Sequence, residues 1–383
     1  MLINLIIGSI VLLTLAYSVL IMLYRYWLLR LPTFTVRENT TPKHTFSIII
    51  PARNEAENIG KCLSSVLTQQ YPSHLFEVIV VDDHSTDTTA DVVRAWQEQY
   101  SQLRLIQLAD ALQGEVLNAY KKKAIAVAIE QSSNDYIVTT DADCTVPPAW
   151  LQHFDAWLQQ HEAVFVAAPV AYEHTGSVVS AFQCLDFLSL QGITAAAVSA
   201  GVHSMCNGAN LMYSKAAFYN VGGFAGIDNI ASGDDMLLMY KMQQQYPQQV
   251  HYLYSSAAVV HTQPMPTWAD FYNQRIRWAS KASHFSDKRI FWVLVLVYCF
   301  NLVLLLLPVW LLVNVAIGVT ALLALVLKTL IELQFMRPVA QFYRKEKLLS
   351  VFPKMQPLHI VYIVVAGWLG KFGSYQWKQR KVH

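Results

Sequence analysis

Charged residues are scarce in this sequence. Asp, Glu, Lys and Arg make up 14% of the 383 residues, whereas 54% are hydrophobic, and a soluble chain of ordinary composition carries about 25% charged residues. This shortage argues against a purely soluble protein, so we expect a membrane part. The formal net charge is only +2. Because no dense run of Lys and Arg is present to track a phosphate backbone, the composition also argues against nucleic acid as a partner.

Cysteine pairs are lacking as well. The cysteines are scattered without a CxxC spacing, at Cys62, Cys144, Cys184, Cys206 and Cys299. The sequence therefore suggests neither a zinc site nor a disulfide framework, and a domain facing the reducing cytosol fits best. A GxGxxG segment is missing after the first expected strand, which weakens a dinucleotide-binding interpretation.

Two long stretches carry no charge. The first runs from Met1 to Tyr24, and at about 1.5 Å per residue it is long enough to cross a hydrocarbon core about 30 Å thick. Its basic residues, Arg25 and Arg30, follow the apolar run, whereas a cleaved signal peptide begins with basic residues. We therefore favour a membrane anchor over a signal peptide, with the following chain on the cytoplasmic side.

The second uncharged stretch, residues 291–327, is too long for one span and is interrupted by Pro308 and Asn314. It predicts two membrane helices joined by a tight turn. Lys328 and Glu332 follow, four residues apart. At this spacing we expect a mutually satisfied ion pair rather than a functional charge inside the membrane.

A third, weaker apolar segment runs from about Leu358 to Phe372. A full crossing there would put the basic tail "WKQRKVH" on the side opposite the basic loop "RPVAQFYRKEK", against the positive-inside tendency. A re-entrant or interfacial final helix would remove this conflict, and the sequence leaves both paths open.

Between Lys43 and about His284, short apolar runs alternate with amphipathic helical patterns, which is typical of a parallel α/β sheet. The expected strands are "FSIIIP", "FEVIVVDD", "LRLIQL" and "DYIVTTDAD", and "STDTTADVV" and "KKKAIAVAI" are expected helices. After the first strand, Asn54 is predicted to cap a helix with Glu57 at the capping-box position. The helical spacing predicts a buried face of Ile59, Cys62, Leu63, Val66 and Leu67.

Acidic residues gather where the expected strands end. In open α/β sheets ligands bind outside the carboxyl ends of the strands, and this edge receives "PARNE", "DDHSTD" and "TTDADC". Asp141 and Asp143 lie one residue apart, which costs folding free energy unless a cation or hydrogen bonds compensate the charges. The spacing suits a hard divalent cation on one carboxylate while the other reaches a hydroxyl, although acidic loops are also common without a function.

Three further groups of residues each have a functional and a structural interpretation. Asp82 and Asp83 end the second strand, where a helix-capping turn would explain the Ser and Thr residues that follow but not Asp83. Asp234 and Asp235, in "IASGDDMLLMYKM", begin an amphipathic helix, whose dipole favours carboxylates there. "QRIRW", residues 274–278, precedes the apolar segments and would also suit an interfacial anchor of Arg and Trp.

In their order and setting these motifs closely resemble glycosyltransferase family 2. The resemblance is to its membrane-integrated members, such as cellulose, hyaluronan and poly-N-acetylglucosamine synthases, whose motifs ceramide glucosyltransferases share. It implies an α/β fold of the GT-A type, a Rossmann-like nucleotide-diphospho-sugar transferase domain, with transmembrane α-helices. It further implies an integral protein of a bacterial inner membrane with an anchor, a cytoplasmic catalytic domain, amphipathic interface helices, and a C-terminal membrane region with a basic tail, at residues 1–30, 43–260, 261–290 and 291–383.

The resemblance assigns the nucleotide side of the site first. Ala52, Arg53 and Glu55 in "PARNE" match the nucleotide-binding loop, and Asp83 matches the carboxylate that contacts the uracil ring. "NGAN", residues 207–210, lies where the family has the wall of its sugar pocket.

The metal and phosphate side follows from the same resemblance. Lys122 is similar to the family lysine near the nucleotide, with Lys121 in place of the usual preceding glycine. Asp141 would approach the ribose or the sugar, and Asp143 would coordinate a divalent cation, magnesium or manganese. His261 is a further candidate ligand, although a lone histidine is more often a structural hydrogen-bonding residue.

On the acceptor side, "GDD" takes the position of the family's Thr/Gly-Glu-Asp motif, so Asp235 would be the general base. Asp234 replaces the usual glutamate with a shorter side chain. "QRIRW" matches the Gln-x-x-Arg-Trp motif. In that match Gln274 and Arg277 would face the diphosphate, and Trp278 would border the acceptor.

The implied activity is inverting transfer of a sugar from a UDP-linked donor to a hydroxyl of a membrane lipid or a growing glycan. Alternatives with the same fold are a processive polysaccharide synthase and a transferase acting on polyprenyl phosphate, whose nucleophile is already ionised. An inactive scaffold is disfavoured because every acidic position that the chemistry requires is present. Three or four helices are few for a polymer channel, so we place glycolipid synthesis ahead of polymer secretion.

Overall fold

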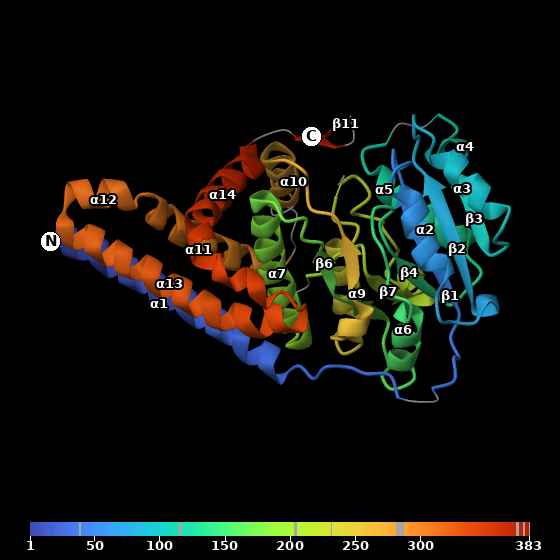
Figure 1. Ribbon diagram of the computed structural model, residues 1–383, viewed down its shortest axis with the longest axis horizontal. Helices are drawn as coiled ribbons and strands as arrows, with labels where there is room; N and C mark the ends of the chain where they lie inside the picture. Colours follow the sequence, from blue (N-terminus) through green and yellow to red (C-terminus); the bar gives the residue numbers. More distant parts are fainter. Residues whose placement is uncertain are drawn as a thin grey trace.

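The computed structural model describes residues 1–37, 40–114, 117–202, 205–230, 232–280, 287–372, 375–377 and 380–382. An α/β domain occupies one end of the elongated molecule and long helices occupy the other (Figure 1). The expected end of the α/β region at His284 and parts of the basic tail lie outside the described residues.

The first half of the central sheet confirms the predicted strands. Its members are β1 (Phe46–Ala52), β2 (Phe76–Asp82), β3 (Leu103–Gln107) and β4 (Tyr136–Thr139). They are parallel neighbours in the order β3-β2-β1-β4, with Ile49 opposite both Ile79 and Thr139. Both faces of β1 and β2 are buried, which explains their nearly continuous runs of Ile and Val.

The second half of the sheet departs from the expected parallel pattern. β7 (Leu211–Ser214) runs antiparallel between β4 and β5 (Phe165–Ala167), and β8 (Val250–Tyr252) completes the edge. β6 (Val170–Tyr172) and β9 (Val260–Thr262) form a separate parallel pair. These strands have three or four residues, too few for a sequence pattern to reveal their direction, so the sheet is mixed.

Helices cover both faces of this sheet (Figure 1). They are α2 (Ile59–Leu67), α3 (Thr89–Gln97), α4 (Leu108–Leu112), α5 (Tyr120–Gln131), α6 (Trp150–Leu158), α8 (Lys215–Asn220) and α9 (Met236–Gln245), with short 3₁₀ turns η1 (Ser73–Leu75) and η2 (Ser256–Ala258). All five apolar residues predicted for the inner face of α2 are buried.

The predicted cap of α2 is wrong. The helix begins at Ile59, five residues after Asn54, and Asn54 instead adopts a left-handed conformation with φ 50°. Its side-chain oxygen accepts a hydrogen bond from the backbone N–H of Thr86 at 2.8 Å. Asn tolerates this backbone conformation and bonds locally, so the residue joins two loops rather than starting a helix.

The remaining helices are long and apolar. α1 (Leu2–Arg30) lies along α13 (Val315–Phe342), while α11 (Lys288–Leu305) leads outward to the short α12 (Leu307–Val313) before the chain returns (Figure 1). The predicted helix pair is therefore present as α11 and α13. Pro308 lies in the first turn of α12, and the Asn314 side chain caps α13.

Four described helices are long and apolar enough to cross a membrane: α1, α7 (Val178–Ser199), α11 and α13. α7 differs from the others because 83% of its apolar window is buried inside the molecule, against 22–33% for the rest. Gly192 brings α7 close to α13, where a Cβ would meet the Val339 side chain at 2.5 Å. α7 is therefore a core helix between the two ends of the molecule.

α10 (Trp268–Ser280) and α14 (Phe352–Phe372) connect the two ends, with the 3₁₀ turn η4 (Glu346–Ser350) before α14. α14 packs against α10 and α11, and it is not among the candidate spans found in the described residues. A short ribbon of β10 (Tyr375–Trp377) and β11 (Arg380–Val382) follows.

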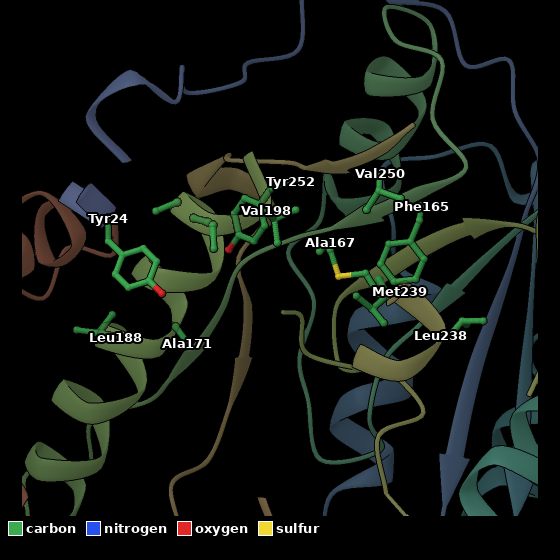
Figure 2. Close-up of a cluster of buried hydrophobic side chains, with 14 of the residues drawn as sticks. Tyr24, Phe165, Ala167, Ala171, Leu188, Val198, Leu238, Met239, Val250 and Tyr252 are labelled. Atoms are coloured by element: carbon green, nitrogen blue, oxygen red, sulfur yellow. The ribbon is translucent and has the colours of Figure 1, made fainter. Parts of the chain in front are cut away.

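One apolar core runs through both ends of the molecule. Figure 2 shows Tyr24 of α1 beside Leu188 of α7, and the same cluster continues through Tyr252 to Phe165 of the sheet. Because close-packed interiors resist deformation, this core fixes the α/β domain against the long helices.

The predicted ion pair between Lys328 and Glu332 is confirmed. Their Nζ and Oε1 atoms are 2.8 Å apart, and Gln356 of α14 accepts a hydrogen bond from Lys328 at 2.7 Å. Tyr17 of α1 donates to Glu332. The four side chains form a closed polar cluster that links α1, α13 and α14.

Candidate active site

A cavity of about 1250 Å³ lies where the α/β domain meets the long helices. Acidic residues from the sheet edge line one part of it, including Asp141, Asp143, Asp234 and Asp235. Apolar side chains of α1, α11 and α14 line the other part, among them Leu20, Ile21, Leu294, Val297, Ile363 and Ala366. The cavity thus joins a charged site to apolar helices.

Lys121 lies at the centre of the acidic part. Its Nζ is 2.8 Å from Asp141 Oδ1 and 3.3 Å from Asp234 Oδ2. Burial acts to lower the pKa of Lys121, but the Asp141 and Asp234 carboxylates outweigh it and raise the pKa above its ordinary value. Lys121 is therefore a fixed cation that links the strand-end acids to the "GDD" segment.

Asp235 is held by two backbone N–H groups. It is the N-cap of α9, where Oδ1 accepts a hydrogen bond from Met236 N at 2.7 Å. Its Oδ2 accepts a hydrogen bond from Gly208 N at 3.2 Å. A Cβ at Gly208 would meet Asp234 Oδ2 at 3.3 Å, so glycine allows the "NGAN" segment to approach both acids. These bonds orient the carboxylate on the cavity wall.

The four residues of "NGAN" have different positions. Asn207, Gly208 and Ala209 line the cavity. Asn210 is fully buried instead, and it accepts a hydrogen bond from Trp150 Nε1 at 2.8 Å and donates to the carbonyl of Pro169 at 2.7 Å. Three residues are therefore available to a ligand, while the fourth holds the segment in the core.

The donor atoms around Asp143 suit a hard cation. Ligand atoms of Asp141, Asp143 and Cys144 lie within 4.8 Å of one another. Burial, followed by the nearby Asp143 and Asp141 carboxylates, raises the pKa of Cys144 well above its ordinary value. The thiol therefore stays protonated and leaves carboxylate oxygens, which magnesium and manganese prefer. The ring of His261 is not in this group among the described residues.

The two segments predicted to hold the nucleotide lie at neighbouring strand ends. Arg53 Nη1 donates to the carbonyls of Asp83 at 2.7 Å and His84 at 3.0 Å, and the backbone N–H of Asp83 donates to Ala52 at 2.8 Å. The Glu55 N–H donates to the Thr89 hydroxyl at 2.8 Å. These bonds join the "PARNE" and "DDHSTD" segments beside β4, outside the residues that line the cavity.

The structure places Lys122 away from the cavity. Its side chain is buried, and Nζ donates to the carbonyls of Ile227, Ile230 and Ser232 at 2.7, 2.6 and 3.0 Å. Consecutive residues of a helix point in directions about 100° apart, so Lys122 points away from the cavity, and its expected role near the nucleotide stays a prediction. Lys121 is the lysine that lines the cavity.

Lys122→Met is expected to lower turnover by about tenfold to a hundredfold, because the loop it holds leads directly into "GDD" and a small displacement of reacting groups costs about that much. Loss of a donor to three carbonyls should also destabilise the fold by about 2 kcal/mol. UDP affinity should stay within about twofold. Calorimetric titration with UDP, beside a thermal melt, tests this, and a large loss of UDP affinity in folded protein would support the predicted role of Lys122 near the nucleotide.

The three residues predicted from "QRIRW" make different contacts. Gln274 accepts a hydrogen bond from the Tyr172 hydroxyl at 3.1 Å. Arg277 lines the cavity, and within the described residues its guanidinium makes no hydrogen bond or ion pair. The Trp278 ring lies 6.1 Å from that of Phe187 and covers the guanidinium of Arg275 at 4.2 Å. All three predicted residues therefore line one cavity with the acids.

Sequence patterns did not single out several other residues of this cavity. Arg275 of α10 pairs with Asp186 of α7, and His359 of α14 lies 3.8 Å from Asp186. Arg275 lies 89 positions after Asp186, and His359 lies 84 positions after Arg275, so no short motif contains them. The available signal was charge within apolar segments, since Asp186 and His359 both lie in long apolar helices.

Comparison with known proteins identifies two matching family models. The model described as "Glycosyl transferase family 2" matches residues 47–222. The model described as "Glycosyl transferase family group 2" matches residues 136–337, which is more than half of the chain.

Individual relatives agree with these matches. Glycosyltransferase AglE of Haloferax volcanii is 30% identical over 190 residues, covering 50% of this chain and 58% of AglE. The poly-beta-1,6-N-acetyl-D-glucosamine synthase of Staphylococcus epidermidis is 23% identical over 248 residues, covering 64% of this chain and 56% of the synthase. The chain thus spans little more than half the length of these curated relatives.

A solved structure shares the fold. The mannosyltransferase PcManGT from Pyrobaculum calidifontis, determined in complex with GDP-Man and Mn²⁺, aligns with a TM-score of 0.61 and 20% sequence identity. The alignment covers 95% of this chain and 98% of PcManGT. The similarity confirms the predicted GT-A fold.

Proposed function

Because the chain belongs to glycosyltransferase family 2, we propose that it is a membrane-bound inverting enzyme that transfers a sugar from a UDP-linked donor to a hydroxyl of a membrane lipid or a growing glycan. The observation that carries this proposal is the single cavity that runs from Asp141, Asp143 and Asp235 to the apolar side chains of α1, α11 and α14. A membrane acceptor can reach the acids along that route.

The donor is proposed to bind across the carboxyl ends of β1, β2 and β4. Ala52, Arg53, Glu55 and Asp83 would hold the nucleoside, with Asp83 at the uracil. We assign the phosphate-side role to Lys121 in place of Lys122, because Lys121 is the cation beside Asp141. A cation there offsets the charge of a diphosphate.

Asp143 is the proposed ligand of a divalent cation. Its carboxylate lies close to the ligand atoms of Asp141 and Cys144, and Asp141 is already paired with Lys121. PcManGT was determined with Mn²⁺, which supports the same chemical class here. When bound, such a cation supplies positive charge beside the departing diphosphate.

The proposed reaction is a single displacement. The acceptor hydroxyl forms a bond to the anomeric carbon, the bond from that carbon to the diphosphate oxygen breaks with its electron pair, and the hydroxyl proton passes to Asp235. Arg277 would face the diphosphate as it leaves, with Gln274 beside it, while Asp234 would contact the acceptor. Attack from the side opposite the leaving group inverts the configuration.

This function is tested by incubating membranes that contain the protein with a panel of radiolabelled UDP-sugars and separating lipid-soluble from polymeric product. Label in lipid-soluble product supports the proposal. Label only in long polymer supports a processive synthase. An absence of transfer from every nucleotide-sugar would support an inactive scaffold.

Trp278→Ala is expected to raise the acceptor KM by about tenfold or more, because a sugar or lipid would lose the aromatic face that borders it. UDP binding and slow hydrolysis of the donor by water should remain. UDP release is measured with and without acceptor, per molecule of monodisperse protein. If Trp278 is only an interfacial anchor, the yield of folded protein should fall while acceptor-dependent turnover per molecule stays normal.

A further inference from the structure

A buried ion pair lies on the wall of the cavity. Arg275 Nη2 of α10 is 2.7 Å from Asp186 Oδ2 of α7, and each side chain has 2% of its surface exposed. Both residues line the cavity. Burial acts to lower the pKa of Arg275, but Asp186 raises it overall, so the guanidinium stays charged.

The pair leaves part of its hydrogen-bonding capacity unused. In the described part of the chain, Arg275 Nη2 and Asp186 Oδ2 contact each other in the ion pair, whereas Arg275 Nε and Nη1 and His359 Nδ1 have no hydrogen-bond partner. The hydroxyls of Tyr172 and Tyr362 lie close to Arg275 and Asp186, respectively. Buried polar groups of this kind are normally satisfied. Donors and acceptors on the same cavity wall therefore indicate a ligand that both accepts and donates hydrogen bonds.

Aromatic rings surround these polar atoms. The Arg275 guanidinium lies 4.2 Å from the Trp278 ring and 4.9 Å from the Phe271 ring, and the Tyr362 ring lies 5.3 Å from that of Phe271. Rings beside carboxylate and guanidinium groups suit a compact ligand with apolar C–H faces and several hydroxyls.

The charges around this position balance. Asp186 is negative and Arg275 is positive. His359 of α14 lies 3.8 Å from Asp186, and burial lowers the pKa of its imidazole, which favours the uncharged form. The other titratable groups that act on these residues include Tyr172 of β6 and Tyr362 of α14, whose hydroxyls burial keeps protonated by raising their pKa values. Lys328 and Glu332 of α13 act on His359 as well, and their charges are paired with each other. Because the charges of this cluster are equal and opposite, it favours an uncharged group over a phosphate, while Arg277 of the same cavity is the cation assigned to the diphosphate.

The ion pair lines the same cavity as the strand-end acids, and Tyr172 senses both. After burial, the strongest influence on the pKa of Tyr172 is Arg275, which lowers it, and Asp186 and Asp143 both raise it. The same hydroxyl donates to Gln274. One side chain therefore lies within electrostatic reach of both the ion pair and the strand-end acids.

We infer that Arg275, Asp186, His359 and Tyr362 form an acceptor subsite for an uncharged, hydroxyl-bearing lipid headgroup, either a glycerol or a sugar. This inference rests on the proposed function and deepens it, since it selects a neutral lipid over polyprenyl phosphate. The headgroup accepts from Arg275 and donates to Asp186, while its alkyl chain lies along α1, α11 and α14.

The test uses the purified protein with its preferred UDP-sugar and three probes, dioctanoylglycerol, dodecyl glucoside and farnesyl phosphate. One or both neutral probes should accept sugar at least tenfold more efficiently, by kcat/KM, than farnesyl phosphate. The double variant Asp186→Leu/Arg275→Met should raise the ratio of acceptor KM to donor KM at least tenfold. Removing both charges avoids an unpaired buried ion, which would threaten folding.

A matched control replaces another buried ion pair, whose two members both lie on α13. Lys328→Met/Glu332→Leu removes a pair whose polar atoms are bonded within their own cluster, and it should keep the acceptor KM within twofold. Tyr362→Phe, which is expected to fold normally, should raise the acceptor KM about threefold. Equal effects of both double variants, an unchanged KM in Asp186→Leu/Arg275→Met, or a preference for farnesyl phosphate would overturn the inference. Transfer to a soluble glycan but to no lipid probe would overturn the lipid-acceptor function itself.

Discussion

Asp235→Asn is expected to lower sugar transfer by a factor of about 10² to 10⁴, the usual contribution of a positioned general base, while UDP affinity stays within a few-fold. An acceptor hydroxyl is a poor nucleophile until its proton leaves, and an amide cannot take that proton. UDP affinity should be kept because of where Asp235 lies. Its carboxylate caps α9 and accepts a hydrogen bond from Gly208 of "NGAN", whereas the residues proposed to hold the nucleoside are in other segments.

Two measurements make this result specific. Calorimetric titration of UDP and a thermal melt show whether the variant is folded and binds donor, since one carboxamide oxygen can keep the cap bond to Met236 N. Asp234→Asn is the matched control, because Asp234 pairs with Lys121 on the same wall, and it should cost less in turnover. Near-normal transfer by Asp235→Asn would favour polyprenyl phosphate, whose nucleophile needs no deprotonation.

Much of the α/β domain was predictable because its signals are local. The Ile and Val runs of β1 and β2 mark strands buried on both faces, and the acids after β2 and β4 follow from where such strands end. A shared site of Asp141 and Asp143 with "GDD" and "QRIRW" was implied by the resemblance to glycosyltransferase family 2, and the structure brings these segments to one cavity.

Other features depend on contacts that no local pattern records. Lys121 and Lys122 are identical neighbours, and only the packing of α5 decides that one lines the cavity while the other donates to the carbonyls of Ile227 and Ser232. Asn54 satisfied a helix-cap pattern, but its bond to Thr86 joins two loops. The pairing of Asp186 with Arg275 joins α7 to α10 across 89 positions.

Asp143→Asn is expected to lower the rate of sugar transfer by a factor of about 10³ and to weaken binding of the UDP-sugar. Without the divalent cation, the negative charge that grows on the departing diphosphate would lose the positive charge that stabilises it most. Removal of divalent cations with EDTA should have the same effect on the unmodified protein, and added Mn²⁺ or Mg²⁺ should restore activity. In the variant, added cation should restore little, since the carboxylate proposed to hold it is gone.

The strand-end acids provide an internal comparison for this result. Asp141 is bonded to Lys121 at 2.8 Å, so Asp141→Asn removes a carboxylate that already has a fixed cation. That variant should keep its response to added Mn²⁺, whereas Asp143→Asn should lose it. Mn²⁺ affinity can be measured directly by electron paramagnetic resonance with UDP present, without reference to turnover. Full activity of EDTA-treated protein, or unchanged Mn²⁺ affinity in Asp143→Asn, would leave Lys121 and Arg277 as the cations that face the diphosphate.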